Sequence, residues 1–313
     1  MVQYTLNRLF WLIPTIFAMS LIVFLVAHNT PGSPLDPAAE GRNSLSDEQM
    51  ANLRAKYGLD KPLWVQYRNF VLNALHGDFG TSFIYKTRTV RDIIGETFPT
   101  SLQLGTLALV LAITLGVTLG VLAAVNQNGP LDYFSIGVAI LGTSLPNFVI
   151  AIFLILIFSL KLRWLPTIGW DFSQPRTLIL PTIVLALGPL AILARYTRSS
   201  MIDVIRSDYV RTARAKGLAE RKVIVGHVLK NALIPVITLI GPLFAAVGTG
   251  SFIIEQIFAV PGMGKFFVTS MAGRDYPMIM AVILLYGVFL SIMNLVVDLV
   301  YGVLDPRIRL GGR

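Results

Sequence analysis

Long stretches without a charged side chain constrain the fold of this chain more than any other feature of its sequence. Lys, Arg, Asp and Glu make up 14% of the 313 residues, whereas a soluble domain carries roughly a quarter. The missing charge is concentrated in six runs: residues 9–27, 97–131, 133–160, 177–194, 231–254 and 276–297. Each approaches or exceeds the roughly 20 residues with which an α-helix crosses about 30 Å of hydrocarbon. The runs lack the alternation of barrel strands, so they predict an all-α membrane protein with six transmembrane helices.

The basic residues predict how these spans are oriented. With six spans, both termini lie on one side of the membrane. The short segments on that side hold more Lys and Arg than those on the other, chiefly within residues 195–230. Since short cytoplasmic loops are enriched in Lys and Arg, we expect both termini in the cytoplasm. The formal net charge of +9 suits anionic membrane lipid or an acidic partner surface; nucleic-acid binding is not expected.

The apolar runs divide the chain into four parts. We expect a cytoplasmic N-terminus with the first transmembrane helix, an extracytoplasmic helical insert, a core of five transmembrane helices and a cytoplasmic C-terminal tail: residues 1–27, 28–98, 99–302 and 303–313. The first run is long for the apolar part of a signal peptide, and no A-x-A-like cleavage site follows it. It is therefore expected to remain as the first helix.

The insert is expected to contain three short helices. Ser46 can cap the first and Gly58 can end it. Pro62 suits the first position of the second helix, and a third would begin near Val90 and run toward the second span. The second helix would bury the side formed by Trp64, Tyr67, Val71 and Leu75. Two roles stay open for the insert: a docking or substrate-guiding surface, or a cap packed on the helix bundle.

Residues for catalysis or metal binding are hard to find. The closest approach to a phosphate-binding loop is Gly-Met-Gly-Lys at residues 262–265. There, Ala259 and Phe266 stand where a Walker A loop needs Gly and Ser or Thr. The chain has no Cys. The three histidines are far apart and lack ligand spacing: His28, His76 and His227. We therefore expect no catalytic residue, no metal site and no cofactor bound by this chain.

Prolines and a few polar residues in the spans are candidates for a translocation pathway. Pro146, followed by Asn147, and Pro189 can kink their helices and expose backbone carbonyls to a central cavity. Asn294 lies one turn from Asp298, so both can line a path. The alternatives are that the prolines only shape packing, and that Asp298 sits near the cytoplasmic interface and pairs locally.

A basic segment between the fourth and fifth runs predicts a helix of about residues 207–217 outside the hydrocarbon. Ser207 can cap this helix, and Asp208 suits its first turn. Gly217 can end it in a left-handed conformation. Tyr209, Ala213 and Lys216 fall along one side. The helix can insert into a groove of another protein, or it can rest on lipid as a basic interfacial helix.

The same segment carries a resemblance to a known family. Ala213-x-x-x-Gly217, with Leu233-Ile234-Pro235 further on, resembles the EAA loop of ABC-importer permeases. The Glu of that family falls on Arg211 and its first Ala on Thr212. Five further motifs, in order, are similar to the B-type permease of dipeptide, oligopeptide and nickel importers: GDFGTS, SLPNF, FAVPGMGK, RDYP and LDPRIR, which begin at residues 77, 144, 258, 274 and 304.

This resemblance implies a set of partners and a coupling site. The partners are a related C-type permease, two cytoplasmic ABC ATPase subunits that bind ATP and Mg, an external substrate-binding protein and membrane lipid. The EAA loop forms the coupling helix in this family, and Ala213 is expected to face the ATPase groove. The implied ATPase-coupling residues are Asp208, Tyr209, Arg211, Thr212, Ala213, Arg214, Lys216 and Gly217.

The resemblance also implies a function and a location. The expected function is that of a non-catalytic permease subunit of a di- or oligopeptide importer in the cytoplasmic (inner) membrane of a bacterium or archaeon. Importers of nickel chelates, opines or glycan oligomers are alternatives within the family. A secondary carrier and a membrane scaffold are alternatives from other classes. The lack of charges near the middle of the spans argues against the carrier, and the proline-interrupted spans argue against the scaffold.

Overall fold

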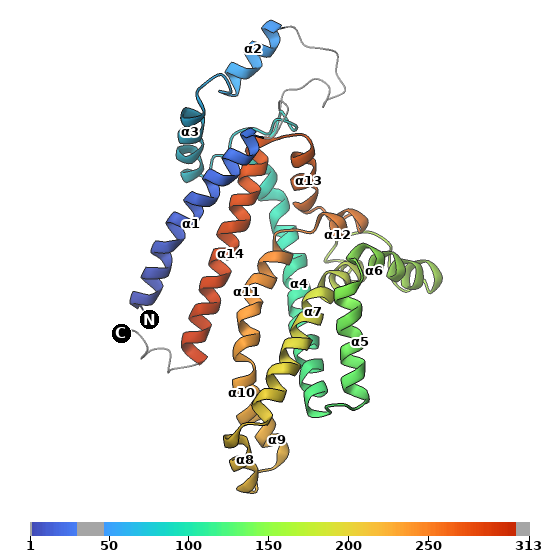
Figure 1. The fold of residues 1–313 in the computed structure, drawn as a ribbon. Coiled ribbons are helices and arrows are strands. Elements are labelled where there is room, and N and C mark those ends of the chain that lie inside the picture. The colour runs from blue at the N-terminus through green and yellow to red at the C-terminus, as the bar shows by residue number, and fades with distance from the viewer. Residues whose placement is uncertain (1, 30–46, 305–313) are drawn as a thin grey trace.

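Four long helices run along the molecule in the structure, a computed structural model that describes residues 2–29 and 47–304 (Figure 1). Each is long and apolar enough to cross a membrane: α1 (Val2–Asn29), α4 (Val90–Val125), α7 (Arg176–Ile205) and α14 (Tyr276–Leu304). α4 packs along α7, and α1 packs along α14. The beginning of α1 and the end of α14 lie on the same side of the molecule (Figure 1).

Two bent helix pairs supply the remaining candidate spans. α5 (Pro130–Ser144) is followed by α6 (Asn147–Leu154) and η2 (Ile155–Lys161), with a bend of 111°. The second pair bends by 52° and consists of α9 (Glu220–Val223), η3 (Ile224–Val228), α10 (Leu229–Ala232) and α11 (Ile234–Gly248). The described part of the chain therefore has four candidate spans, or up to six if each bent pair counts as one.

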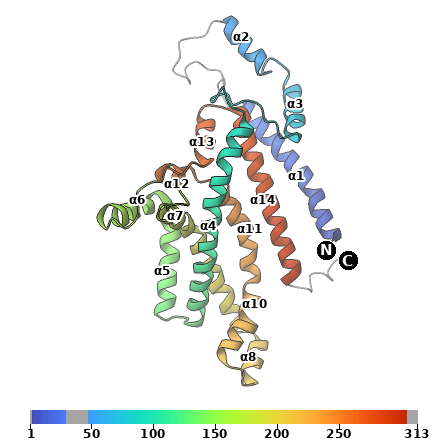
Figure 2. The ribbon, with the colours of Figure 1, turned by 180° about the vertical axis from the view of Figure 1, so that it is seen from behind.

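The run at residues 133–160, predicted as one helix, is broken near its middle. Leu145 has an extended backbone, with φ −93° and ψ 132°, and Pro146 precedes α6. The physical reason is that a proline disfavours helical conformation in the residue before it and cannot donate the next helical hydrogen bond. From behind, α6 extends sideways from the bundle (Figure 2). The third predicted span is thus sharply bent at Pro146, one of the prolines that can kink their helices.

Small residues allow α4 and α7 to pack closely. A Cβ on Gly116 would lie 2.8 Å from the carbonyl oxygen of Leu190, and one on Gly120 would lie 2.6 Å from that of Ala194. Small residues let helix backbones approach each other in membranes, where packing rather than hydrophobic burial drives association. The buried core beside this contact includes Leu104, Ala108, Ala112, Val184 and Leu193.

The described part of the insert contains two helices, α2 (Asp47–Lys56) and α3 (Leu63–Leu75). The predicted cap at Ser46 lies outside the described residues. Gly58 follows α2 with φ +66°, and Pro62 directly precedes α3 rather than occupying its first turn. The predicted third short helix is wrong, because Val90 begins the 36-residue α4. Thr89 caps α4 by accepting a hydrogen bond from the Asp92 backbone N–H, at 3.1 Å.

The predicted buried side of α3 is wrong at Trp64 and Leu75, whereas Tyr67 and Val71 are half-buried. Trp64 and Leu75 are 67% and 77% exposed. Tyr67 alone of the four residues packs with the aromatic side chains of α1. The reason is that the other side of α3, with Asn69 and Asn73, turns toward a cavity shared with the rest of the insert.

Candidate coupling site and pathway residues

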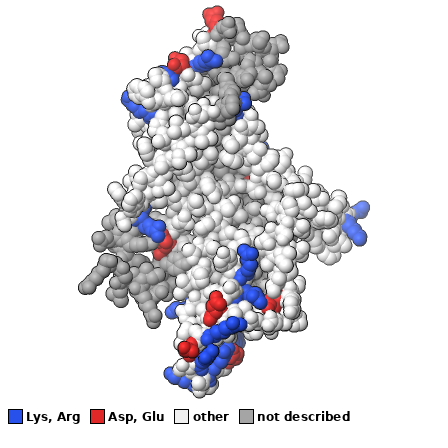
Figure 3. Space-filling model, viewed as in Figure 1, with Lys and Arg blue, Asp and Glu red and all other residues white. Residues whose placement is uncertain are grey.

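The basic segment forms a short helix, α8 (Asp208–Ala215), at the end of the molecule farthest from α2 (Figure 1). Charged side chains gather around this end on the face seen in Figure 3. Gly217 follows the helix with φ +74°, as its predicted left-handed role requires. The predicted cap is wrong: the Ser207 hydroxyl donates to the backbone carbonyl of Val204, at 2.6 Å, instead of capping the helix.

One side of α8 is buried against the rest of this chain. Val210 is fully buried and Ala213 is 5% exposed. Both belong to a cluster with residues of α4, α7, α9, η3 and α10: Ala124, Met201, Val223, Ile224, Val228 and Ala232. The expectation that Ala213 faces an ATPase groove is therefore wrong, because its methyl group packs inside this chain.

The other side of α8 is exposed and is tied to the following helices. Its exposed residues are Asp208, Tyr209, Arg211, Thr212, Arg214, Lys216 and Gly217. The Arg214 guanidinium donates to Glu220 at 2.6 Å, and this hydrogen bond raises the pKa of Arg214 further, so the group stays charged. Asn231 donates to the Tyr209 hydroxyl at 2.7 Å. The helix thus presents a mainly basic face while fixed to its own scaffold.

A buried ion pair joins α5 and α7, and sequence reasoning missed it. Asp132 is almost fully buried. Its carboxylate accepts a hydrogen bond from Arg198 Nη2 at 2.7 Å and one from the Asn128 backbone N–H at 2.8 Å. One signal was available, because Asp132 is the single charged residue that separates two of the apolar runs.

A second buried carboxylate organises the segment between α11 and α14. Glu255, in α12 (Phe252–Ile257), accepts hydrogen bonds from the Ser101 hydroxyl and the Gly264 backbone N–H, each at 2.7 Å. Gly264 begins α13 (Gly264–Ala272). Burial raises the pKa of Glu255, and these donors oppose that rise. The Gly-Met-Gly-Lys segment therefore holds a carboxylate of its own chain.

A third carboxylate connects two motifs that are far apart in the sequence. The Ser82 hydroxyl, in the Gly77–Phe83 segment, donates to the buried carboxylate of Asp275, in the Arg-Asp-Tyr-Pro motif. Asp275 also accepts from the Met278 backbone N–H, at 3.3 Å, in the first turn of α14. This contact fastens the insert to the start of the last long helix.

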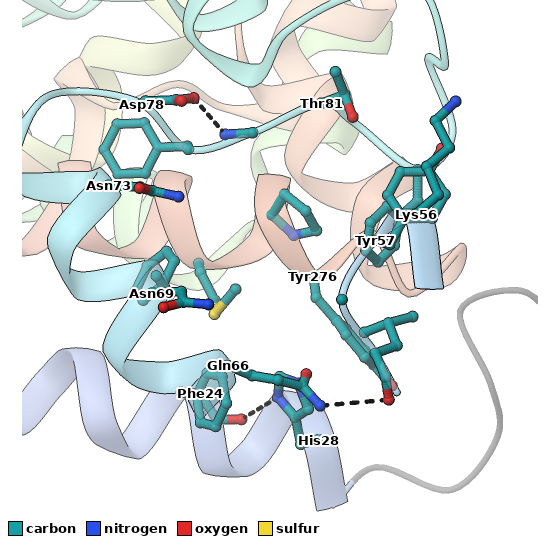
Figure 4. Close-up of a pocket in the computed structure, with 18 residues that line it drawn as sticks. Phe24, His28, Lys56, Tyr57, Gln66, Asn69, Asn73, Asp78, Thr81 and Tyr276 are labelled. Atoms are coloured by element: carbon teal, nitrogen blue, oxygen red, sulfur yellow. Dashed lines mark hydrogen bonds between the residues drawn. The ribbon is translucent and has the colours of Figure 1, made fainter. Parts of the chain in front are cut away.

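A cavity of about 320 Å³ lies between the insert and the neighbouring ends of α1 and α14 (Figure 4). Its lining combines aromatic and amide side chains. His28 stacks on Phe24, with ring centroids 4.0 Å apart, and its Nε2 lies 3.1 Å from the Gln66 side-chain oxygen. Asn69 and Asn73 face the cavity from α3. The insert and the bundle therefore share a polar, aromatic cavity here.

The predicted pathway residues lie on two different sets of helices. Pro146 and Asn147 lie at the break before α6, and Pro189 is buried in α7. A Cβ on Gly142 would lie 2.7 Å from the carbonyl oxygen of Leu187, so α5 crosses α7 close to Pro189. Asn294 of α14 is exposed and faces Gly241 of α11. The four predicted residues therefore do not line a single translocation pathway within this chain.

Asp298, the charged neighbour of Asn294, pairs with a distant part of the chain. Its carboxylate lies 3.2 Å from Arg8 Nε of α1. The predicted pairing thus occurs, but it joins the first and last long helices rather than neighbouring residues. Within residues 2–29 and 47–304, no group of three His, Asp or Glu side chains is placed to hold a metal ion.

A bundle of apolar helices, four of them long and apolar enough to cross a membrane, is the architecture of a multi-pass membrane protein. The N-terminal family model for binding-protein-dependent transport system membrane components matches residues 1–105. The model for the inner membrane component of the same systems matches residues 116–310. The chain therefore belongs to the family of binding-protein-dependent transport system inner membrane components, which confirms the resemblance seen in its motifs.

Two curated relatives match over nearly their whole length. The dipeptide transport system permease protein DppB of Bacillus subtilis (strain 168) is 46% identical over 310 residues, which is 99% of each chain. The oligopeptide transport system permease protein OppB of Escherichia coli (strain K12) is 43% identical over 309 residues, covering 99% of this chain and 100% of the relative.

A solved structure shares the fold of the core. A chain of the MetNI methionine ABC transporter, solved in an inward-facing conformation, aligns with a TM-score of 0.56. The alignment covers 68% of this chain and 96% of that chain, at 14% sequence identity. At this identity the likeness concerns the fold alone.

Proposed function

We propose that this chain is the transmembrane permease subunit of an ATP-driven importer of di- and oligopeptides and forms half of the translocation pathway. The observation that carries the proposal is the full-length similarity to two peptide-system permeases, at 46% and 43% identity. ATP and Mg bind in partner ATPase subunits, and the second half of the pathway comes from a C-type permease. Nickel chelates or other small oligomers are the alternative substrates within the family.

The proposed contact with the ATPases is the exposed side of α8. This side carries Arg211, Arg214 and Lys216, which suit an acidic rim on a partner. Val210 and Ala213 fix the opposite side to the permease. Because α7 leads directly into α8, a displacement of α8 by the ATPases acts first on α7. This arrangement supports α8 as the element that transmits the energy of ATP hydrolysis.

The proposed topology has both termini and α8 in the cytoplasm and residues 28–98 outside. The basic end with α8 and the insert with α2 lie at opposite ends of the molecule, and the long helices lie between them (Figure 1). The insert either receives the substrate-binding protein or caps the core at residues 99–302. Its fastening to α14 through Ser82 and Asp275 is compatible with both roles.

Reconstitution of the transporter tests the function. The chain is purified with its C-type permease and ATPases, inserted into liposomes, and supplied with ATP and the binding protein. Uptake of labelled di- and tripeptides is expected, and a nickel chelate is the comparison substrate. Nickel uptake without peptide uptake would select the alternative. Substrate uptake by this chain alone, driven by an ion gradient, would identify a secondary carrier.

A further inference from the structure

The helix α3 exposes an apolar stripe that no described part of the protein covers. Trp64, Leu72 and Leu75 are all exposed. Their spacing of eight and three residues places them on one side of the helix. The opposite side carries Gln66, Asn69 and Asn73, which line the cavity (Figure 4). The amide side of α3 therefore faces the cavity, and the stripe faces outward.

The position of α3 beside α1 gives its depth relative to the membrane. The Tyr67 hydroxyl lies 2.9 Å from the Ser20 hydroxyl, and the Tyr67 ring contacts the rings of Phe17 and Phe24, with centroids 6.0 and 5.2 Å away. At a rise of about 1.5 Å per residue, Ser20 lies roughly 14 Å from the Asn29 end of α1. This is close to half of a hydrocarbon core about 30 Å thick. The ring of Tyr67 therefore lies at the depth of one leaflet.

The surface of α1 beside α3 is itself apolar and exposed. Phe17, Ile22 and Leu25 are exposed on a helix that qualifies as a membrane span. The apolar stripe of α3 adjoins this exposed apolar surface of α1. Figures 1 and 2 both show α3 alongside the upper part of α1. The continuity with the exposed face of a candidate membrane span indicates lipid as the occupant of the stripe.

Two side chains of α3 are of the type found at a membrane interface. Trp64 lies at the beginning of the helix, and tryptophan is enriched where hydrocarbon meets headgroups. Arg68 is exposed on the same side as the stripe, and a long arginine side chain can extend its charge to lipid phosphates while its stem stays in apolar surroundings.

We propose that α3 packs beside α1 within the leaflet at the Asn29 end of α1, with its exposed stripe facing lipid. Its stripe of Trp64, Leu72 and Leu75 contacts lipid acyl chains, Arg68 contacts lipid phosphates, and its amide side chains face the cavity. The inference goes beyond transport itself, because it depends on neither the substrate nor the ATPases. It assigns part of the insert to the membrane instead of to the aqueous side.

Single cysteines in this Cys-free chain test the proposal. Spin labels are attached to the purified full chain at Leu72→Cys and Leu75→Cys, and the chain is placed in liposomes with and without its partner subunits. Collision with oxygen, which concentrates in lipid, is compared with collision with a water-soluble nickel complex. Ile22→Cys on exposed α1 is the lipid control, and Ala55→Cys on exposed α2 is the water control.

The proposal expects the oxygen-to-nickel ratio at both α3 labels to match the ratio at Ile22 and to exceed that at Ala55 several-fold. Ratios equal to the one at Ala55 would place α3 in water and overturn it. Shielding from both reagents only when partners are present would assign the stripe to a protein interface and also overturn it.

A second measurement needs no spin label, so it avoids any distortion of α3 that a label could cause. Phe replaces Trp11, Trp164 and Trp170, which leaves Trp64 as the only tryptophan. Lipids brominated on their acyl chains should then quench most of its fluorescence. Quenching no greater than that of a soluble tryptophan would contradict the proposal independently of the labels.

Discussion

Arg198 of α7 binds the buried carboxylate of Asp132 at the start of α5 through both Nε and Nη2, and the second contact is 2.7 Å long. The pair lies toward the end of the molecule that carries α8, into which α7 leads. Because it joins α5 to α7, we expect a movement of α7 to be passed to α5. The ion pair is thus placed to keep these two helices moving as one body.

Removal of the Asp132 carboxylate should destabilise the chain. Asp132→Ala leaves the partly buried Arg198 without its acceptor, at an expected cost of about 1–3 kcal/mol. Thermal unfolding of the purified chain in detergent measures the loss. The matched control is Glu96→Ala, which removes the exposed pair with Arg88 and should cost about 0–1 kcal/mol. Equal effects of the two substitutions would show that the buried pair does not brace the fold.

Gly217 should tolerate Asn but not Val. Its φ of +74° lies in the left-handed region, and no atom lies within 4 Å of an added Cβ, so backbone strain alone decides the outcome. The strain should cost about 1–2 kcal/mol for Val, whereas Asn adopts this conformation readily. Retention of the ATPases on co-purification and peptide uptake should both fall for Gly217→Val and persist for Gly217→Asn. Normal transport by Gly217→Val, at normal membrane level, would argue against α8 as the coupling element.

Ala213→Trp should damage the permease before any ATPase binds. The site is buried among residues of this chain, and overpacking of such a site costs about 1–3 kcal/mol or more. The variant chain alone should unfold at a lower temperature. Thr212→Trp, on the exposed side, should leave that temperature unchanged and reduce ATPase retention. The reverse pattern would place Ala213, not Thr212, at the partner surface.

The stability contributed around Glu255 should depend on pH. Burial raises the pKa of Glu255, so the folded state holds this proton more tightly than the unfolded chain. Stability then falls as pH rises from the ordinary glutamate pKa, about 4.3, through the raised value. The Gln side chain of Glu255→Gln cannot ionise. The unfolding temperature of this variant, relative to that of the wild type, should therefore rise as the pH increases over this range. A constant difference between the two unfolding temperatures would exclude the linkage. Glu48→Gln on exposed α2 serves as the control.

The two ends of the molecule should label from opposite sides of the membrane. Ala55→Cys in α2 and Thr212→Cys in α8 are both exposed. In intact cells an impermeant thiol reagent added outside should modify the first and not the second, and lysis should make the second reactive. Modification of both in intact cells would overturn the proposed topology.

The sequence by itself determined the class of the protein and the position of the short helix α8. Charge-free runs are local features, and their length alone predicts helices that cross a membrane. The order of short motifs indicated the family. The family models match the two parts of the chain that contain these motifs. The end of α8 before Gly217 was predictable because a left-handed glycine is a local property of the backbone.

The tertiary structure decided which sides of these helices meet and where charge is buried. Apolar periodicity predicted that Trp64 and Leu75 face protein, yet lipid and protein both accept apolar side chains, so the pattern alone does not identify the neighbour. The burial of Ala213 required the approach of η3 and α10. Asp132 with Arg198 and Ser101 with Glu255 join residues far apart in the chain, and only the packing of their helices brings such partners within hydrogen-bond distance.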